Sequence, residues 1–294
     1  MSPYLTWTLD PVMLHFGPIQ LRYYGVLFVA TIYTGFHVWR QQALKNGESK
    51  AFADRFLWWG VVAILGGSRL GHVFFYEHKT YLAHPGEIIK FWKGGLASHG
   101  ATVGLVLVLW AYAHRHGRTW VRLGDYLAPA IALAAGGVRL GNFINAEIVG
   151  RVTQVPWGVR FIRYCRFENI PAAACLPRHP SQIYEFFAGL LTFGVLTWIE
   201  RKDVRRAGSG LASGVFLALY FGLRVVLEFF KEFQDEQLRS DGFLRAWEQS
   251  FGHSFTTGQY LSFPLVIIGI ALIVRALLQP KDRIPVPVAT VPVK

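Results

Sequence analysis

The sequence predicts an all-α integral membrane protein with about seven transmembrane helices and a small extracytoplasmic head. Of its 294 residues, 52% are hydrophobic and only 16% are charged, whereas soluble domains carry about a quarter charged residues. Apolar stretches of roughly 20 residues recur along the chain, and each is about long enough to cross a hydrocarbon core as a helix. Basic residues also gather in alternate loops, which is how topology signals are arranged.

Seven apolar stretches are expected to span the membrane, and the fourth of them has a polar end. They are residues 23–39, 56–76, 94–113, 125–146, 182–199, 210–230 and 260–279. The first 21 residues contain no Lys or Arg, so the positive region of a cleavable signal peptide is missing. The first span is therefore expected to be an uncleaved anchor.

The net charge of +12 is distributed as membrane topology requires, which argues against a nucleic-acid partner. Lys and Arg residues number 4, 3, 4 and 4 in the segments 40–55, 114–122, 201–209 and 275–294. They number 0, 3, 5 and 3 in the segments 1–17, 77–93, 148–180 and 231–258, which are longer in total. The positive-inside rule places the first set in the cytoplasm. With seven spans, the N-terminus then lies outside and the C-terminus in the cytoplasm.

Two segments are set apart from a polytopic membrane domain that covers residues 1–279. Residues 148–180 form a head insertion that carries both cysteines, Cys165 and Cys175. In an oxidising compartment these cysteines can pair, and two free thiols are the alternative. Residues 280–294 are rich in proline, which cannot continue a helix. They are expected to form a disordered cytoplasmic tail.

Arg139 carries a charge within a stretch that is otherwise apolar enough to cross a bilayer. A charge in hydrocarbon costs several kcal/mol, so it is tolerated where it faces a polar cavity or a partner. Asn142 lies three residues further on, on the same face of a helix. Asn145 and Glu147 point elsewhere if the helix continues, and Gly141 is then expected to mark where the helix loosens. The alternative is a polar helix end with a snorkelling arginine.

The sixth predicted span repeats this pattern. Tyr220, Arg224, Glu228 and Lys231 fall within an arc of about 80° on an otherwise apolar helix, so they are expected to face the bundle interior. Arg224 and Glu228 are four residues apart, and the alternative is that they only neutralise each other. Together with Arg139, Arg224 indicates a site for an anionic group inside a membrane protein.

Two further polar motifs begin predicted spans on the same outer side. His99 opens the third span, and histidine has the unperturbed pKa that suits proton transfer near neutrality. A purely structural histidine is the alternative. The run from Arg178 to Glu185 opens the fifth span, where Pro180 fits the first helical turn. Gln182 and Glu185 give this helix start a polar patch, although a capped helix alone would account for it.

These motifs resemble those of the bacterial phosphatidylglycerol–prolipoprotein diacylglyceryl transferases. The run Gly137–Arg151 resembles the family's signature, and the run Arg178–Glu185 resembles its second motif. The resemblance covers nearly the whole chain, because further motifs match in order and spacing at 24–25, 94–99, 224–230 and 258–262. One departure is Lys231-Glu-Phe-Gln, where the family often has Arg-x-Pro-Asp.

The resemblance implies transfer of the diacylglyceryl group of phosphatidylglycerol to the lipobox cysteine of a prolipoprotein. A thioether forms and glycerol phosphate leaves, which is the first step of lipoprotein maturation in the bacterial inner membrane. His99 is the expected base for the thiol, and Arg139 and Arg224 are expected to hold the departing phosphate. The expected substrate-binding residues are Tyr24, Asn142, Asn145, Glu147, His179, Gln182, Tyr184, Glu185 and Tyr220.

The expected partners are phosphatidylglycerol, prolipoprotein signal peptides with a lipobox cysteine, and membrane lipids. The chain is expected to act as a monomer, without a metal or a redox cofactor. Two other function classes remain as alternatives. A carrier or flippase for an anionic lipid would show internal repeats, which the sequence lacks. An intramembrane serine protease, indicated by Ser213, would need a histidine at matching depth, whereas His99 is expected near the opposite face.

Overall fold

The computed structural model describes residues 4–17, 19–90, 95–202, 208–232 and 255–279 of a mostly helical chain. The predicted tail and most of the segment 231–258 lie outside the described residues. The long helices are α1 (Tyr23–Lys45), α2 (Lys50–Phe75), α4 (Ser98–Arg115), α5 (Trp120–Asn145), α7 (Ser181–Lys202) and α12 (Thr257–Leu278). A further helical run consists of α8 (Leu211–Val215), η5 (Phe216–Tyr220), α9 (Phe221–Leu227) and η6 (Glu228–Phe230).

Four helical segments in the described part are long and apolar enough to cross a membrane. They are Trp120–Asn145, Ser181–Lys202, Leu211–Phe230 and Gly258–Leu278. The other predicted spans coincide with α1, α2 and α4. The protein is thus a helical membrane protein, as its composition predicts.

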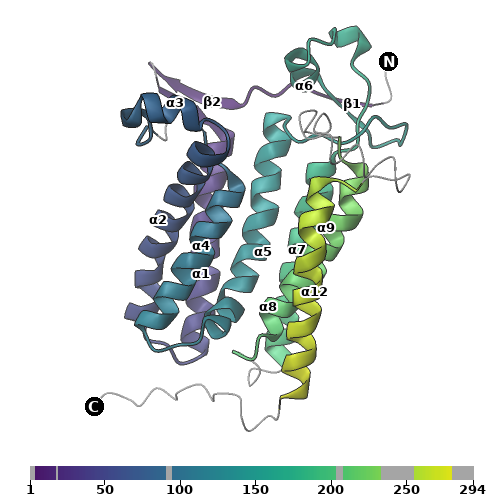
Figure 1. Ribbon diagram of the computed structural model, residues 1–294. Helices are drawn as coiled ribbons and strands as arrows, with labels where there is room; N and C mark the ends of the chain where they lie inside the picture. Colours follow the sequence, from purple (N-terminus) through teal and green to yellow (C-terminus); the bar gives the residue numbers. More distant parts are fainter. Residues whose placement is uncertain (1–3, 18, 91–94, 203–207, 233–254, 280–294) are drawn as a thin grey trace.

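α5 lies in the middle of the molecule, with α1, α2 and α4 on one side of it and α7, α8, α9 and α12 on the other (Figure 1). It packs against α1 on the first side and against α7 on the second. Thr119 caps the start of α5 by accepting a hydrogen bond from the backbone N–H of Arg122, which satisfies one of the free donors of a helix start. Because α5 contacts both groups of helices, its last turn lies where the two groups meet.

α2 and α4 approach each other through glycine. A Cβ atom on Gly67 would lie 2.5 Å from the backbone oxygen of Gly100, and one on Gly71 would lie 2.7 Å from its Cα. Small residues allow this backbone contact between membrane helices. Toward the C-terminal end of α4, a buried core with aromatic residues joins it to α1, α2 and α5. In that core Trp39 stacks on Phe56 with ring centroids 4.0 Å apart.

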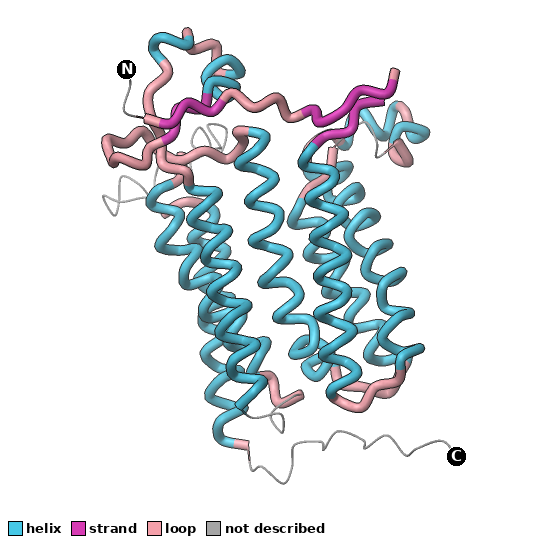
Figure 2. Tube along the Cα trace, turned by 180° about the vertical axis from the view of Figure 1, so that it is seen from behind, coloured by secondary structure: helices cyan, strands magenta, loops and turns pink. Residues whose placement is uncertain are grey.

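Short strands and the head cover one end of the bundle (Figure 2). β2 (Val12–Phe16) and β3 (Ile19–Arg22) form an antiparallel hairpin that leads into α1, and β1 (Leu5–Trp7) pairs in parallel with β4 (Val159–Phe161). The all-α prediction omitted these strands. β1 and β4 pair residues that are far apart in the sequence. β2 and β3 are too short to show a clear alternation of polar and apolar residues.

The head contains β4, α6 (Ile162–Phe167) and η3 (Ala172–Ala174). Cys165 and Cys175 form a disulfide there, which decides between the two alternatives that the sequence left open. The two ends of the head lie side by side, because the backbone N–H of Gly150 donates to the backbone oxygen of His179 at 3.0 Å. At the same end lie α3 (His78–Ala83) and η1 (Pro85–Glu87).

Candidate functional site

The last turn of α5 brings its polar side chains together. α5 stays helical to Asn145, and Ala146 then takes a left-handed conformation with φ 54°, which is uncommon for a residue with a side chain. The turn carries Glu147 back over the helix end, where Asn142 Nδ2 and Asn145 Nδ2 lie 3.3 and 3.1 Å from its two carboxylate oxygens. The prediction that Gly141 loosens the helix is therefore wrong.

Gly141 instead makes room for Tyr24. A Cβ atom at this position would lie 2.8 Å from Cδ2 of the Tyr24 ring, so the ring lies directly against the backbone of α5. Tyr24 is within electrostatic range of both Arg139 and Glu147. The first and fourth predicted spans therefore share one site.

Buried ion pairs connect α5 to α7 and to the helical run that ends in η6. Arg139 Nε lies 3.1 Å from Glu185 Oε2, and Lys231 Nζ lies 3.6 Å from Glu185 Oε1 and 3.2 Å from Glu228 Oε2. Glu185, Glu228 and Lys231 are all buried. Charges removed from water in this way are stable only when they are paired. The cluster thus holds the three elements at fixed distances around Arg139.

Arg139 retains hydrogen-bonding capacity in this cluster. Its guanidinium has five N–H donors. In the described part it pairs with one oxygen of Glu185, makes a long contact of 3.4 Å to Asn142 Oδ1 and interacts with the Tyr220 hydroxyl. The contact to Asn142 confirms that these two residues share a helix face. The remaining donors are available to a ligand oxygen.

Arg224 does not pair with Glu228, contrary to the neutralisation that the sequence left open. Among the described carboxylates none forms an ion pair with Arg224, because Glu228 pairs with Lys231 instead. Tyr220 lies within electrostatic range of Arg139 and Arg224. It ends the π-helical turn η5, a feature that often occurs at functional sites. The half-buried Arg224 thus adds a second cation without a carboxylate of its own.

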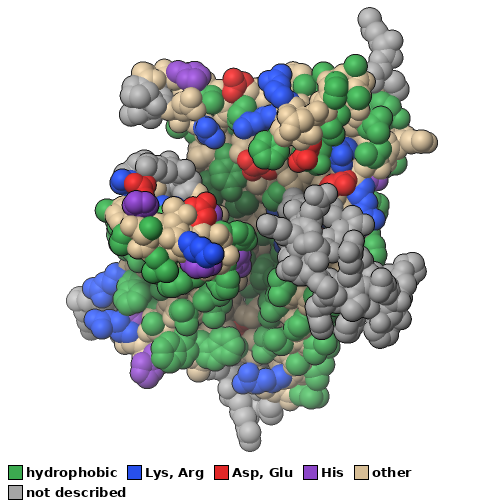
Figure 3. Space-filling model, turned by 45° about the horizontal axis from the view of Figure 1, so that its top comes forward, with side chains coloured by type: hydrophobic (Ala, Val, Ile, Leu, Met, Phe, Trp, Pro, Cys, Tyr) green, Lys and Arg blue, Asp and Glu red, His purple; other side chains and the backbone are tan. Residues whose placement is uncertain are grey.

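Gln182 holds the turn at Glu147, and contacts among His179, Tyr184 and Trp157 lie beside it. Gln182 Nε2 donates to the backbone oxygen of Glu147 at 2.6 Å. Tyr184 Oη accepts from Trp157 Nε1 at 2.7 Å and lies 3.1 Å from His179 Nδ1. Burial lowers the pKa of His179 below its ordinary value, so the neutral ring is favoured. Figure 3 shows this end of the molecule brought forward, with a hollow near its centre.

His99 is not in contact with the Arg139 cluster. It is exposed at the start of α4, and its ring neighbours are Phe75 and Tyr76 of α2, at centroid distances of 5.2 and 5.7 Å. No hydrogen bond or ion pair within the described residues connects it to Arg139. The structure therefore brings together every predicted site residue on α1, α5, α7, η5 and α9 or on the adjoining loops, and leaves His99 apart.

Two other buried arginines hold loops. Arg69 donates to the backbone oxygens of Ile88 and Gly95 at 2.8 and 3.1 Å and lies over the Tyr81 ring. Arg178 donates to the oxygen of Gly150 at 3.1 Å and to the carboxylate of Glu232 at 2.6 Å. Carbonyl oxygens and loop carboxylates satisfy these guanidinium groups. Neither belongs to the cluster around Arg139.

Sequence reasoning missed Trp157 and the role of Lys231. Trp157 lies in the head, 27 residues from Tyr184, and no local pattern indicates that pairing. Lys231 is on the predicted polar stripe, and its pairing with Glu228 could have been predicted, because the two are three residues apart. No group of three or more His, Cys, Asp or Glu residues within the described part is arranged to hold a metal ion.

Ser213 lies in α8, whereas His99 lies at the start of α4. Its backbone N–H donates to Asp125 Oδ1 at 2.9 Å, and Asp125 also accepts from the N–H groups of Gly208 and Gly210. The Asp125 carboxylate thus ties the start of α8 to α5. Ser213 and His99 do not form a catalytic pair, so the protease alternative lacks its site.

Comparisons with known proteins show which family the chain belongs to. The family model described as prolipoprotein diacylglyceryl transferase matches residues 11–275. A phosphatidylglycerol–prolipoprotein diacylglyceryl transferase of Pseudoalteromonas atlantica is 35% identical over 94% of this chain and 92% of its own length. Proteins of the same name from Nitrosomonas europaea and Cupriavidus necator are 38% and 35% identical, over 90% and 91% of this chain and 88% and 92% of their own lengths. The chain therefore belongs to the prolipoprotein diacylglyceryl transferase family.

Proposed function

We propose that the chain transfers the diacylglyceryl group of phosphatidylglycerol to the lipobox cysteine thiol of a prolipoprotein. The observation that carries this proposal is the site around Arg139 in a member of this family. Two arginines with free hydrogen-bonding capacity lie among apolar helices, and one of them is fixed by a buried carboxylate. Such a site suits a lipid phosphate, because guanidinium groups bind phosphate oxygens through forked hydrogen bonds.

The membrane arrangement belongs to the same proposal. Seven helical segments cross the bacterial inner membrane, with the N-terminus and the head outside and the C-terminus in the cytoplasm. The asymmetry of Lys and Arg supports this orientation, as does the disulfide in the head. A C-terminal alkaline phosphatase fusion is expected to be inactive, and an active fusion would contradict the arrangement.

The reaction needs a nucleophile from the substrate and cations at the leaving group. The cysteine thiol of the prolipoprotein loses its proton, and its sulfur bonds to the glyceryl carbon that carries the phosphate. The bond from that carbon to the phosphate oxygen breaks, and glycerol phosphate leaves with the bonding electrons. Arg139 and Arg224 stabilise the negative charge that builds up on this phosphate. Tyr24, Asn142, Asn145, Glu147 and Tyr220 orient the headgroup.

His99 is the proposed acceptor of the thiol proton. His99 is exposed at the start of α4, so a peptide that approaches from outside the bundle can reach it. This suits a group that acts on the second substrate. Gln182, Glu185, His179 and Tyr184 support the phosphate site through the contacts to Glu147, Arg139 and Trp157. The thiol role thus falls to α4, and the phosphate role falls to the cluster around Arg139.

The test is a transfer assay with the purified full-length protein in detergent. It is incubated with phosphatidylglycerol and a lipobox peptide, and mass spectrometry is expected to show the peptide heavier by one diacylglyceryl group together with released glycerol phosphate. The matched control is the same peptide with serine in place of the lipobox cysteine, which is expected to remain unmodified. Absence of product from phosphatidylglycerol, with product from another phospholipid, would overturn the proposed donor.

A further inference from the structure

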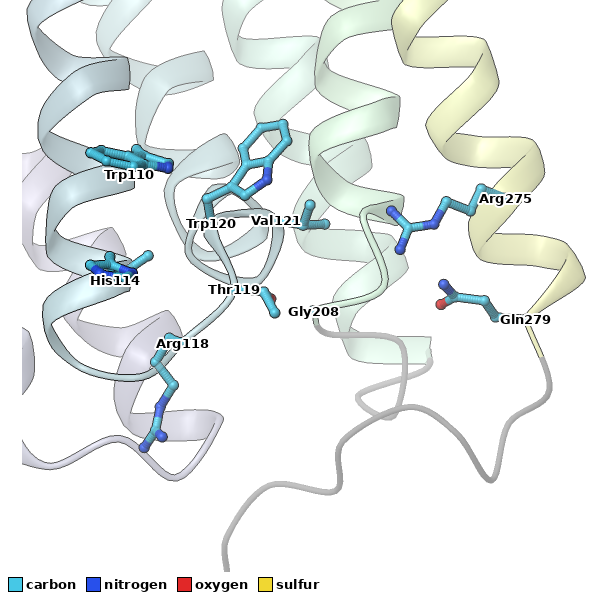
Figure 4. A pocket seen from close by; sticks show the side chains of 10 residues that line it. Trp110, His114, Arg118, Thr119, Trp120, Val121, Gly208, Arg275 and Gln279 are labelled. Atoms are coloured by element: carbon cyan, nitrogen blue, oxygen red, sulfur yellow. The ribbon is translucent and has the colours of Figure 1, made fainter.

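A cavity lies among the last turns of α4 and α12 and the start of α5 (Figure 4), whereas Arg139 lies toward the other end of α5. Its volume is about 570 Å³. The last turn of α4, the loop that leads into α5, and the last turn of α12 surround it. The side chains that matter for its chemistry are Trp110, His114, Arg118, Trp120, Arg275 and Gln279.

Within the described residues, the lining carries a positive charge that no carboxylate balances. Arg118 lies 2.9 and 3.1 Å from the two carboxylate oxygens of Glu48, so its charge is balanced. Arg275 is exposed, and no carboxylate in the described part of the chain pairs with it. The ten lining residues include no Asp or Glu. Figure 4 shows Arg275 and Gln279 extending from α12 toward Gly208 and Val121.

The aromatic residues of the lining place the cavity at the depth of a lipid headgroup. Trp110 and Trp120 are 60% and 56% exposed, and tryptophan with one polar N–H is enriched at the boundary between membrane and water. The His114 ring stacks on Trp110 with ring planes inclined by 5°. These rings form an amphipathic wall opposite Arg275.

An apolar surface leads from the cavity toward the membrane interior. Ile268, Leu272 and Arg275 are spaced by four and three residues and therefore lie along one face of α12, which ends just before Gln279. Ile268 is 49% exposed. A lipid whose phosphate contacts Arg275 places its acyl chains along this face. A soluble anion has no acyl chains, so this apolar face would add nothing to its affinity.

We propose that this cavity binds the phosphate of an anionic glycerophospholipid from the leaflet opposite the one that serves the Arg139 site. Arg275 donates charge-assisted hydrogen bonds to the phosphate, Gln279 contacts the polar headgroup, and Trp110 and Trp120 flank the glycerol region. The site is separate from the transfer site, so its occupant is a bound lipid that is not consumed.

The test is native mass spectrometry of the full-length protein titrated with phosphatidylserine or with phosphatidylcholine of the same acyl chains. Phosphatidylserine is anionic, and phosphatidylcholine carries the same phosphate with no net charge. Arg275→Ala is compared with Arg115→Ala. Arg115 is likewise an exposed arginine, but it lies in the last turn of α4 and outside the cavity lining. Arg275→Gln is a second substitution that retains a polar side chain.

Wild type and Arg115→Ala are expected to bind phosphatidylserine equally and more tightly than phosphatidylcholine. Both substitutions of Arg275 are expected to weaken phosphatidylserine binding on the order of tenfold, which corresponds to the loss of a hydrogen bond to a charged group. Diacylglyceryl transfer by these variants shows that they are folded. Equal binding by Arg275→Gln and wild type, or equal losses in the Arg115 and Arg275 variants, would overturn the proposal. Displacement of the lipid by an equal concentration of inorganic phosphate would also do so.

Discussion

The charge of Arg139 is positioned by a chain of contacts from three separate elements. Glu185 holds the guanidinium at 3.1 Å, and Lys231 lies between Glu185 and Glu228 at 3.6 and 3.2 Å. In a buried cluster of this kind, removal of one partner leaves another charge uncompensated. Each member therefore affects both the stability of the fold and the position of the group that meets the phosphate.

Arg139→Ala is expected to lower kcat for diacylglyceryl transfer on the order of 100-fold or more, because a contact to the developing anion is lost. Arg139→Lys should restore little, since an ammonium group cannot make the forked contact. The measurement is the rate of peptide modification at saturating phosphatidylglycerol, with Arg115→Ala as a control for loss of charge alone. A kcat within twofold of wild type for Arg139→Lys would contradict the forked contact.

Lys231→Met should destabilise the protein by about 3 kcal/mol, because Glu185 and Glu228 would remain buried without their shared cation. Lys231→Arg, which keeps the charge, should retain most of the stability. Thermal unfolding in detergent compares the two variants with wild type. An unchanged midpoint for Lys231→Met would show that the carboxylates do not need this partner.

His99→Gln should lose turnover at neutral pH while it still binds phosphatidylglycerol. Its residual rate should increase about tenfold per pH unit up to the thiol pKa of about 8.5, because free thiolate then replaces the missing base. The comparison is His179→Gln. His179 favours its neutral form and lies against Tyr184, so this variant should keep the pH profile of wild type. A pH–rate series on both variants checks this, and a fast His99→Gln at neutral pH would remove His99 from the proton transfer.

The sequence predicts the relative positions of site residues that lie on one helix face, but not the positions of those that depend on a turn. Asn142 follows Arg139 by three residues, and the two are in contact. The position of Glu147 depends on the left-handed backbone of Ala146, a conformation that alanine rarely adopts and that composition does not reveal. The Trp157 contact is equally hidden, because it joins the head to α7.

At the scale of helices, the length of an apolar stretch predicts where a helix occurs. The local backbone geometry decides which side chains of that helix become neighbours. The helical run 211–230 contains a π-helical turn before α9 and a 3-10 turn after it. On a uniform helix Arg224 and Glu228 would be neighbours. The final turn tightens, and Glu228 pairs with Lys231 instead. Hydrophobic periodicity carries no signal for such changes, because they leave the apolar length intact.

The contact between α2 and α4 provides a matched test of backbone packing. Gly67→Ala should destabilise the protein, since its Cβ would lie 2.5 Å from the Gly100 oxygen, whereas a Cβ at Gly66 meets nothing within 4 Å. Overpacking of this kind costs about 1–3 kcal/mol. Thermal unfolding of Gly67→Ala and Gly66→Ala measures the difference between neighbouring positions. Equal unfolding midpoints would show that α2 and α4 can move apart without a loss of stability.

At the scale of the whole molecule, α5 joins two groups of helices, and the head covers the end where they meet (Figure 1). The polar cluster lies at that end, and the cavity around Arg275 lies at the other. The positions of the long apolar helices follow from hydropathy. The closure of the head depends on contacts between Gly150 and His179, which are far apart in the sequence.

Cys165→Ser is expected to loosen the head while the helices stay intact. The disulfide closes a loop with a sequence separation of 10 residues, and loss of such a constraint costs roughly 2–3 kcal/mol in the chain-entropy description. Limited proteolysis should cut the variant faster within residues 148–180 than wild type. Cys175→Ser should behave in the same way. Equal cleavage rates in the reduced and oxidised wild-type protein would contradict this expectation.

The closed ends of the head make it an exchangeable cassette. Near its two ends, the backbone N–H of Gly150 donates to the backbone oxygen of His179 at 3.0 Å, and the backbone N–H of Thr153 donates to the backbone oxygen of Pro177 at 2.9 Å. An insertion whose ends lie side by side can be replaced by one of different length without moving the elements that carry it. Chimeras that graft the heads of different relatives onto one helical frame would therefore isolate what the head contributes to the choice of prolipoprotein.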